Sequence, residues 1–144
     1  GHDDQHLLAQ IKTFLNPRGI LSALAHGGHG DKILLADGNF PLATRAGSAE
    51  KIYLGLERDL PTVSQVLAAL NSVAVFERAE VMLPEHGEEP ECFGEFRSLL
   101  GGMALSPLGR YEFYDACCEP GVILAISTGE SRTYGNLLLT IGVC

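Results

Sequence analysis

The 144-residue chain has few basic side chains, no paired-cysteine motif and no long apolar run, and each absence excludes a class of protein. Its ten lysines and arginines are scattered among eighteen aspartates and glutamates, which gives a net charge of -8. Nucleic-acid binding needs a basic face, so we expect no nucleic-acid partner. No apolar run approaches the length that spans a bilayer and no signal-peptide pattern opens the sequence, so we expect no membrane association.

The four cysteines lack the spacing of a metal site. Cys92, Cys117, Cys118 and Cys144 form no C-x-x-C pair, which argues against a structural zinc site, and we expect no metal. Adjacent cysteines on a helix point in different directions and rarely pair, so we expect reduced thiols in a cytoplasmic protein. Cys117 and Cys118 are expected to pack rather than to act as nucleophiles, because nothing near them in the sequence supplies a base.

The length and the 46% hydrophobic content suffice for one domain with a real core. We expect residues 1–144 to form this domain, with residues 1–15 as an N-terminal extension in which Gly1 and His2 could remain from a tag. Apolar runs indicate strands, and apolar residues at helical spacing indicate helices. Strands are expected at 33–36, 51–54, 79–83, 103–108, 122–127 and 137–141, and helices at 4–15, 16–27, 59–70, 91–100 and 110–116.

This alternation of helices and strands predicts an α/β fold, a layered helix–sheet–helix domain with a mixed, largely parallel sheet. Residues 38–50 are rich in turn formers and are expected to be a loop. Residues 84–90, PEHGEEP, indicate an acidic turn in which His86 is simply exposed.

The stretch from Gly27 to Pro41, GGHGDKILLADGNFP, combines a buried strand with polar residues at both ends. His29 precedes the strand among glycines, and Asp37 follows it. These are the ingredients of a small polar site. The alternative is a helix–loop–strand connection in which Asp37 only caps a turn, and spacing alone slightly favours this alternative.

Two later segments also carry polar and aromatic residues, GRYEFYDA at 109–116 and TGESRTYGN at 128–136. Together with the first stretch, in this order and spacing, they resemble the D-ribose pyranase and L-fucose mutarotase family, and its fucose-type branch more closely. The resemblance extends from about Asn16 to the C-terminus. It implies a helix-flanked mixed sheet, interconversion of sugar anomers or ring forms without metal or cofactor, and a homo-oligomer with sites near subunit boundaries.

The resemblance also implies which residues bind and convert the monosaccharide. The family's catalytic histidine falls on His29, and its substrate-binding positions fall on Asp37, Arg110, Tyr134, Gly135 and Asn136. Opening a cyclic hemiacetal removes a proton from the anomeric hydroxyl and adds one to the ring oxygen, which suits a histidine that titrates near neutrality. Carboxylate, guanidinium and amide groups suit the remaining hydroxyls.

Some features leave the substrate and the function open. Lys32 stands where an acidic residue commonly follows GHGD, and Gly38 stands where alanine is usual, so the sugar could be fucose-like or ribose-like. Arg110 could instead pair on the surface with a neighbouring carboxylate, and Asn136 could be a turn residue. A monosaccharide-binding protein without turnover and a structural or regulatory oligomer subunit are the alternative functions.

The placement of His29 and Asp37 at opposite ends of one strand raises a geometric question. A straight strand would hold them about 16–20 Å apart, at a rise of roughly 3.3 Å per residue. Either the glycine-rich loop carries His29 back towards Asp37, or the two residues serve one site from different subunits. The rings that could cover the apolar face of a sugar are those of Phe40, Tyr111, Tyr114 and Tyr134.

Overall fold

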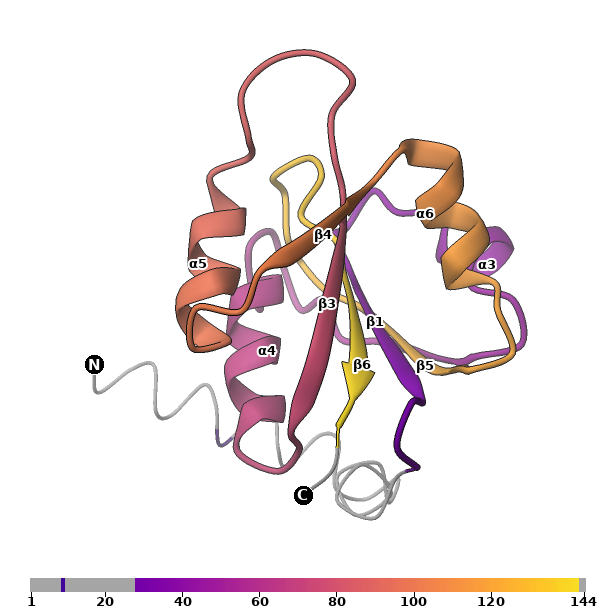
Figure 1. Ribbon diagram of the computed structural model, residues 1–144. Coiled ribbons are helices and arrows are strands. Elements are labelled where there is room, and N and C mark those ends of the chain that lie inside the picture. The colour runs from indigo at the N-terminus through magenta and orange to yellow at the C-terminus, as the bar shows by residue number, and fades with distance from the viewer. Residues whose placement is uncertain (1–8, 10–27, 143–144) are drawn as a thin grey trace.

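The computed structural model describes residue 9 and residues 28–142, and in them a six-stranded sheet lies between two layers of helices (Figure 1). The strands are β1 Lys32–Ala36, β2 Glu50–Tyr53, β3 Phe76–Met82, β4 Leu105–Leu108, β5 Val122–Ser127 and β6 Leu137–Ile141. The helices are α3 Leu42–Arg45, α4 Val63–Asn71, α5 Cys92–Leu99 and α6 Arg110–Cys117. The helices expected at 4–15 and 16–27 and the extension at 1–15 lie outside the part that is described.

The sheet has the strand order β2-β5-β1-β6-β3-β4. The pairs β1 with β5, β2 with β5 and β3 with β4 are parallel, whereas β6 is antiparallel to both of its neighbours, β1 and β3. Five strands therefore point in one direction and β6 alone runs against them, which confirms the predicted mixed, largely parallel sheet. We call the edge where these five strands end the carboxyl edge, and the opposite one the amino edge.

The central strand β1 is buried on both faces, which explains its uninterrupted apolar sequence. Ile33 and Leu35 pack with side chains of α4 and α5, whereas Leu34 and Ala36 pack with side chains of α3 and α6. All four are fully buried. Side chains alternate between the faces of a strand, so one short run joins the two halves of the core.

Helix α4 begins at Val63 because the preceding residue caps it. The Thr62 hydroxyl accepts the Gln65 backbone N–H at 3.2 Å, and the Gln65 side chain accepts the Thr62 backbone N–H at 2.8 Å. This reciprocal capping box satisfies two of the backbone donors that a helix leaves open at its start. The helix therefore starts a little later than the expected range of 59–70.

One helix was not predicted. Residues 42–45, placed in a loop by the sequence, form the single turn of α3, in which the Pro41 carbonyl accepts the backbone N–H groups of Thr44 and Arg45 at 3.2 and 2.9 Å. Leu42 is buried and anchors the turn to the core beside α6. Four residues are too few to show a helical period, so the pattern gave no signal.

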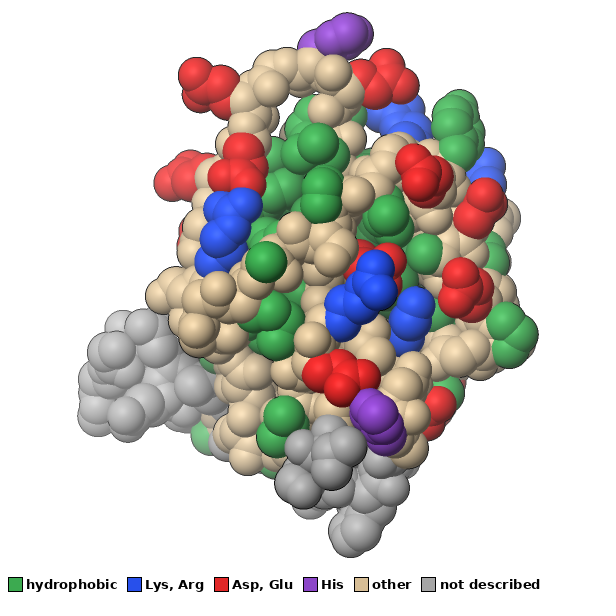
Figure 2. Space-filling view, viewed as in Figure 1, with side chains coloured by type: hydrophobic (Ala, Val, Ile, Leu, Met, Phe, Trp, Pro, Cys, Tyr) green, Lys and Arg blue, Asp and Glu red, His purple; other side chains and the backbone are tan. Residues whose placement is uncertain are grey.

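Side chains of both charges share the visible surface, and the three described cysteines are unpaired. On the face seen in Figure 2 the basic side chains are scattered among acidic ones rather than gathered into a patch. Within residues 28–142, none of the helices is both long and apolar enough to cross a membrane. Cys92, Cys117 and Cys118 are free thiols, and burial raises the pKa of the Cys92 thiol to about 11, so this group stays protonated at neutral pH.

Candidate active site

The connection from β5 to β6 builds the site. Because β6 lies on the other side of β1 from β5, residues 128–136 must cross the carboxyl edge at the point where β1 ends. The Thr128 hydroxyl donates to the Ala36 carbonyl at 2.9 Å, and the Asp37 backbone N–H donates to the Asn136 side-chain oxygen at 2.8 Å. Two segments that are about a hundred residues apart in sequence are thus joined at one point.

A cavity of about 240 Å³, which we call the Asp37 pocket, opens at this point. Four of the predicted substrate-binding residues line it: Asp37, Arg110, Tyr134 and Asn136. The Arg110 Nη2 donates to the Tyr134 hydroxyl at 3.2 Å. Binding sites of open α/β sheets lie beyond the carboxyl ends of the strands, and the Asp37 pocket has this position.

Asp37 is the buried charge of the pocket, with 4% of its surface exposed. Burial raises the pKa of its carboxyl above the usual value, and the nearby Glu130 charge acts in the same direction, while backbone N–H groups of Asn39, Gly135 and Phe40 oppose the shift. The Asn39 N–H donates to Oδ1 at 3.0 Å. The carboxyl is therefore oriented by the backbone at the bottom of the pocket, where it can accept hydrogen bonds from hydroxyl groups.

Backbone conformation explains the order Tyr134-Gly135-Asn136. Tyr134 has a φ of 60°, in the left-handed region that non-glycine residues occupy at a cost. A Cβ on Gly135 would lie 2.8 Å from Glu130 Cγ, so only glycine fits there. Gly135 does not line the Asp37 pocket, and it contributes a backbone N–H to Asp37 rather than a side chain. The resemblance predicted Gly135 as a substrate-binding residue and did not indicate that it acts through its backbone.

Aromatic rings form one wall of the pocket. Phe40 and Tyr114 meet edge to face with 5.5 Å between ring centroids, and both line the cavity together with Tyr134. Tyr111, the fourth ring considered, is 68% exposed and only flanks Tyr114. The sequence did not indicate Pro41, Met82 or Thr133, which line the pocket as well, as does Asn39. Met82 ends β3 at the carboxyl edge, a position that can be recognised only once the strand order is known.

His29 does not reach the Asp37 pocket within one chain. It precedes β1 at the amino edge, where its Nε2 lies 2.9 Å from both carboxylate oxygens of Glu77. The Gly30 backbone N–H donates to the Ile141 carbonyl at 2.9 Å and holds the loop at this edge. The expectation that the loop carries His29 back towards Asp37 is therefore wrong for a single chain, because β1 separates the two residues by its length of about 16 Å.

His29 is nevertheless an accessible histidine with a partner. Its side chain is 58% exposed, and that of Glu77 is 44% exposed. A carboxylate on one ring nitrogen fixes the tautomer and the orientation of an imidazole and leaves the other nitrogen free. No sequence pattern indicates Glu77, because it lies 48 residues away on β3. The catalytic role of His29 stays a prediction. Nothing in residues 28–142 groups three or more histidine, cysteine or acidic side chains as a metal ion would need.

A six-stranded α/β sheet with a polar, aromatic-walled pocket at its carboxyl edge is an arrangement that suits the binding of a small hydroxylated molecule. The chain belongs to the RbsD / FucU transport protein family, whose model matches residues 9–144. It is 33% identical to the fucose mutarotase of Homo sapiens over 147 residues, with 94% of each chain covered. It is 28% identical to the D-ribose pyranase of Coprothermobacter proteolyticus over 132 residues, which covers 92% of this chain and 97% of the relative.

Solved structures of the family share the fold. The structure of Bacillus subtilis RbsD complexed with D-ribose matches with a TM-score of 0.73 and 27% identity, covering 85% of this chain and 90% of that one. FucU from Bifidobacterium longum matches with a TM-score of 0.75 and 26% identity, covering 89% and 94% of the two chains. These similarities confirm the family that the three sequence segments indicated.

Proposed function

We propose that the protein is a cofactor-independent isomerase that interconverts the anomers or ring forms of a monosaccharide, fucose-like or ribose-like. The observation that carries this proposal is the convergence of Asp37, Arg110, Tyr134 and Asn136 on one pocket at the carboxyl edge. A carboxylate, a guanidinium and an amide bind hydroxyl groups, and the rings of Phe40 and Tyr114 cover the apolar C–H face of a sugar. The free thiols support a cytoplasmic location.

The reaction requires two proton transfers around one bond. When the ring opens, the bond between the anomeric carbon and the ring oxygen breaks, the anomeric hydroxyl loses its proton and the ring oxygen gains one. Closure on the other face of the resulting carbonyl reverses both transfers. A neutral imidazole can accept the proton of the anomeric hydroxyl and, as imidazolium, give it to the ring oxygen, and it carries out the reverse two transfers during closure.

The acid/base group is proposed to be His29 of a second copy of the chain. His29 is exposed at the amino edge, away from the pocket of its own chain, and it is already oriented by Glu77. A homo-oligomer that brings the amino edge of one subunit to the carboxyl edge of another would complete each site. In a closed symmetric assembly every subunit can give one histidine and receive one.

A sugar-binding protein without turnover is the competing function, and one observation favours it: none of the described residues that line the Asp37 pocket of a single chain is a histidine. Saturation-transfer NMR with L-fucose and D-ribose separates the two, because it detects binding and exchange between anomers in one experiment. The proposed function predicts transfer of saturation between the anomer signals at a rate that rises with protein concentration. Binding signals without this transfer would contradict the isomerase and support the binding protein.

Replacing Arg110 by alanine should weaken sugar binding and leave the free energy of unfolding unchanged or slightly raised. Arg110 opens α6, where a positive charge is unfavourable beside the helix N-terminus, and its only hydrogen bond among the described residues is to Tyr134. Its guanidinium therefore has several donors available for vicinal hydroxyls. Sugar affinity by NMR titration and urea unfolding measure the two effects.

The matched control is Arg58→Ala, because Arg58 is 82% exposed and its only ion pair among the described residues is with the Asp59 carboxylate, at 3.9 Å. It should leave sugar affinity unchanged. Equal affinities in Arg110→Ala and Arg58→Ala would remove Arg110 from the binding site.

A further inference from the structure

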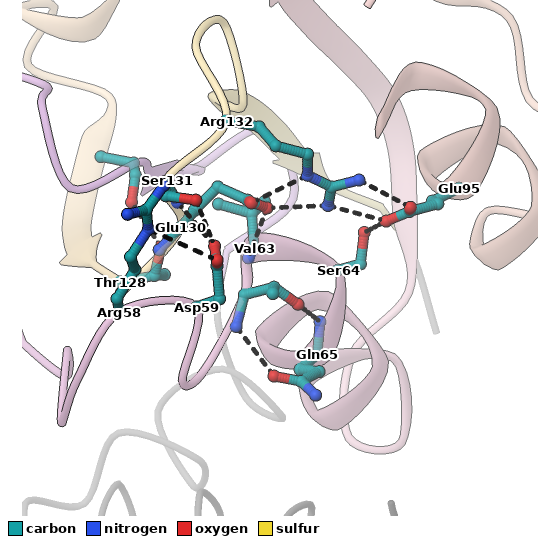
Figure 3. Close-up of polar contacts among 12 residues, drawn as sticks. Arg58, Asp59, Val63, Ser64, Gln65, Glu95, Thr128, Glu130, Ser131 and Arg132 are labelled. Atoms are coloured by element: carbon teal, nitrogen blue, oxygen red, sulfur yellow. Dashed lines mark hydrogen bonds and ion pairs between the residues drawn. The ribbon is translucent and has the colours of Figure 1, made fainter. Parts of the chain in front are cut away.

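The segment that crosses the carboxyl edge is held by an arginine between two carboxylates (Figure 3). Arg132 donates from Nη1 and Nη2 to the two oxygens of Glu95 on α5, at 2.7 and 3.0 Å. It also donates from Nε and Nη2 to the two oxygens of Glu130 in its own segment, at 2.9 and 3.0 Å. Paired hydrogen bonds of this kind fix orientation as well as distance, so Arg132 ties residues 128–136 to α5 in one geometry.

The carboxylate of Glu130 lies inside the protein. Its side chain is 0% exposed, and besides Arg132 it accepts the Val63 backbone N–H at the start of α4, at 3.3 Å. A buried carboxylate is tolerated only when it is paired and hydrogen-bonded, and Arg132 supplies that pairing. The backbone of Glu130 also holds the other half of the site, because its carbonyl accepts the Gly38 N–H, next to Asp37, at 2.8 Å.

Glu130 in turn supports the residues that enter the Asp37 pocket. Its side chain packs directly beneath Gly135, where a Cβ would come within 2.8 Å of Glu130 Cγ. Gly135 separates Tyr134 and Asn136, both of which line the pocket. Tyr134 occupies the left-handed region, a conformation that persists only where its surroundings impose it. Glu130 and the arginine that holds it are part of these surroundings, beside the hydrogen bonds of Arg110 with Tyr134 and of Asn136 with Asp37.

We propose that Arg132 is a positioning residue that sets the affinity for sugar, because it locks Glu130 against Glu95 and so fixes Tyr134 and Asn136. Arg132 does not line the Asp37 pocket and would act only through the segment that it holds. The expected effect of Arg132 on sugar affinity rests on the proposed function. The expected effect of Arg132 on the rigidity of residues 128–136 is independent of any ligand.

The test uses variants that loosen the segment without leaving Glu130 unpaired. Glu95→Ala removes the anchor on α5 and keeps the pair of Arg132 with Glu130, while Arg132→Lys keeps the charge but cannot bridge two carboxylates with paired hydrogen bonds. We expect KM for anomer exchange of L-fucose or D-ribose to rise roughly ten-fold in both variants, with kcat within about two-fold of the original. A purely structural role would instead lower kcat through loss of folded protein and leave KM unchanged.

Arg97→Ala is the control. Arg97 lies on α5 with Glu95 and forms a similar paired contact with Glu89, and it has no hydrogen bond or ion pair with the described residues 128–136. It should leave KM unchanged. Hydrogen–deuterium exchange provides the second readout: the amides of Gly135 and Asn136 should exchange faster in Glu95→Ala than in Arg97→Ala, with or without sugar.

The outcomes separate the two proposals. Unchanged amide exchange in Glu95→Ala would overturn the positioning role, whatever the protein does with sugars. Unchanged KM in an active Glu95→Ala protein would overturn it as well. A third outcome is that amide exchange is faster in Glu95→Ala but the original protein neither binds nor converts any sugar. This outcome would support the hold of Arg132 on the segment and would contradict only the proposed function.

Discussion

Anomer exchange should stop when His29 is replaced by alanine, while the sugar still binds and the fold is retained. General acid/base catalysis contributes about 10²- to 10⁴-fold, and no other group is proposed to carry the proton during ring opening. The His29 side chain is 58% exposed, so its removal should not unfold the chain. His29→Gln should have the same effect on exchange, because an amide does not titrate. Saturation transfer between the anomer signals measures the loss.

His86 offers the decisive comparison. It is the other histidine of the described part of the chain, and it lines a cavity that shares Arg110 and Tyr134 with the Asp37 pocket. If the acid/base group came from the same chain as the pocket, His86→Ala would stop exchange and His29→Ala would not. Normal exchange in His29→Ala would therefore end the catalytic assignment of His29.

A mixing experiment tests whether the site is shared between subunits. His29→Ala and Asp37→Asn chains are each expected to be inactive alone. If one copy supplies His29 and another supplies Asp37, random assembly of equal amounts should restore about a quarter of the sites. No recovery in assemblies that light scattering shows to be mixed would contradict shared sites, and a protein that is monomeric at micromolar concentration would contradict the oligomer.

The second large effect is expected from Asp37→Asn, which should weaken sugar binding and anomer exchange by roughly 10²-fold. The reason is that a buried carboxylate forms stronger hydrogen bonds to hydroxyl groups than an amide does.

The free energy of unfolding of Asp37→Asn should instead rise at neutral pH. Burial raises the pKa of Asp37 in the folded protein above the usual value of an aspartate. The folded state therefore holds this proton to higher pH than the unfolded state.

The sign of the pH effect follows from that difference. As the pH rises above the unfolded pKa, the chain loses stability through Asp37, and the loss is complete once the pH exceeds the raised folded pKa. Asparagine does not ionise, so its advantage in the free energy of unfolding should be absent at acidic pH and present at pH 7. Urea unfolding at the two pH values measures it. Asp115→Asn, an exposed change on α6, is the control, and an equal pH response of the two variants would refute the account.

Much of the fold follows from local patterns in the sequence. Buried strands such as β5 and β6 are continuous apolar runs, and both have the bounds that the runs predicted. The strand β3 begins at Phe76, three residues before the expected start, because the exposed pair Glu77 and Arg78 separates Phe76 from the buried residues that begin at Ala79. The strand order could not be derived from these patterns, since nothing in a single strand specifies its neighbours.

The grouping of the site residues depends on the strand order, which the sequence patterns do not provide. Asp37, Arg110, Tyr134 and Asn136 were grouped by resemblance to a family, and their convergence is explained only by the path of residues 128–136 across the end of β1. The same topology separates His29 from the pocket. Arg132 was overlooked because its partners, Glu95 and Glu130, are determined by tertiary packing and leave no periodic trace in the sequence.

The central position of β1 also has a consequence for how the protein is made. Both neighbours of β1 are the last two strands, which lie about a hundred residues further along the chain, so the contacts at the centre of the sheet have high contact order. On the ribosome, β1 emerges early as an apolar strand with two open edges, which are hazards for aggregation. The protection of β1 and the formation of the Asp37 pocket occur together, when β6 is inserted between β1 and β3.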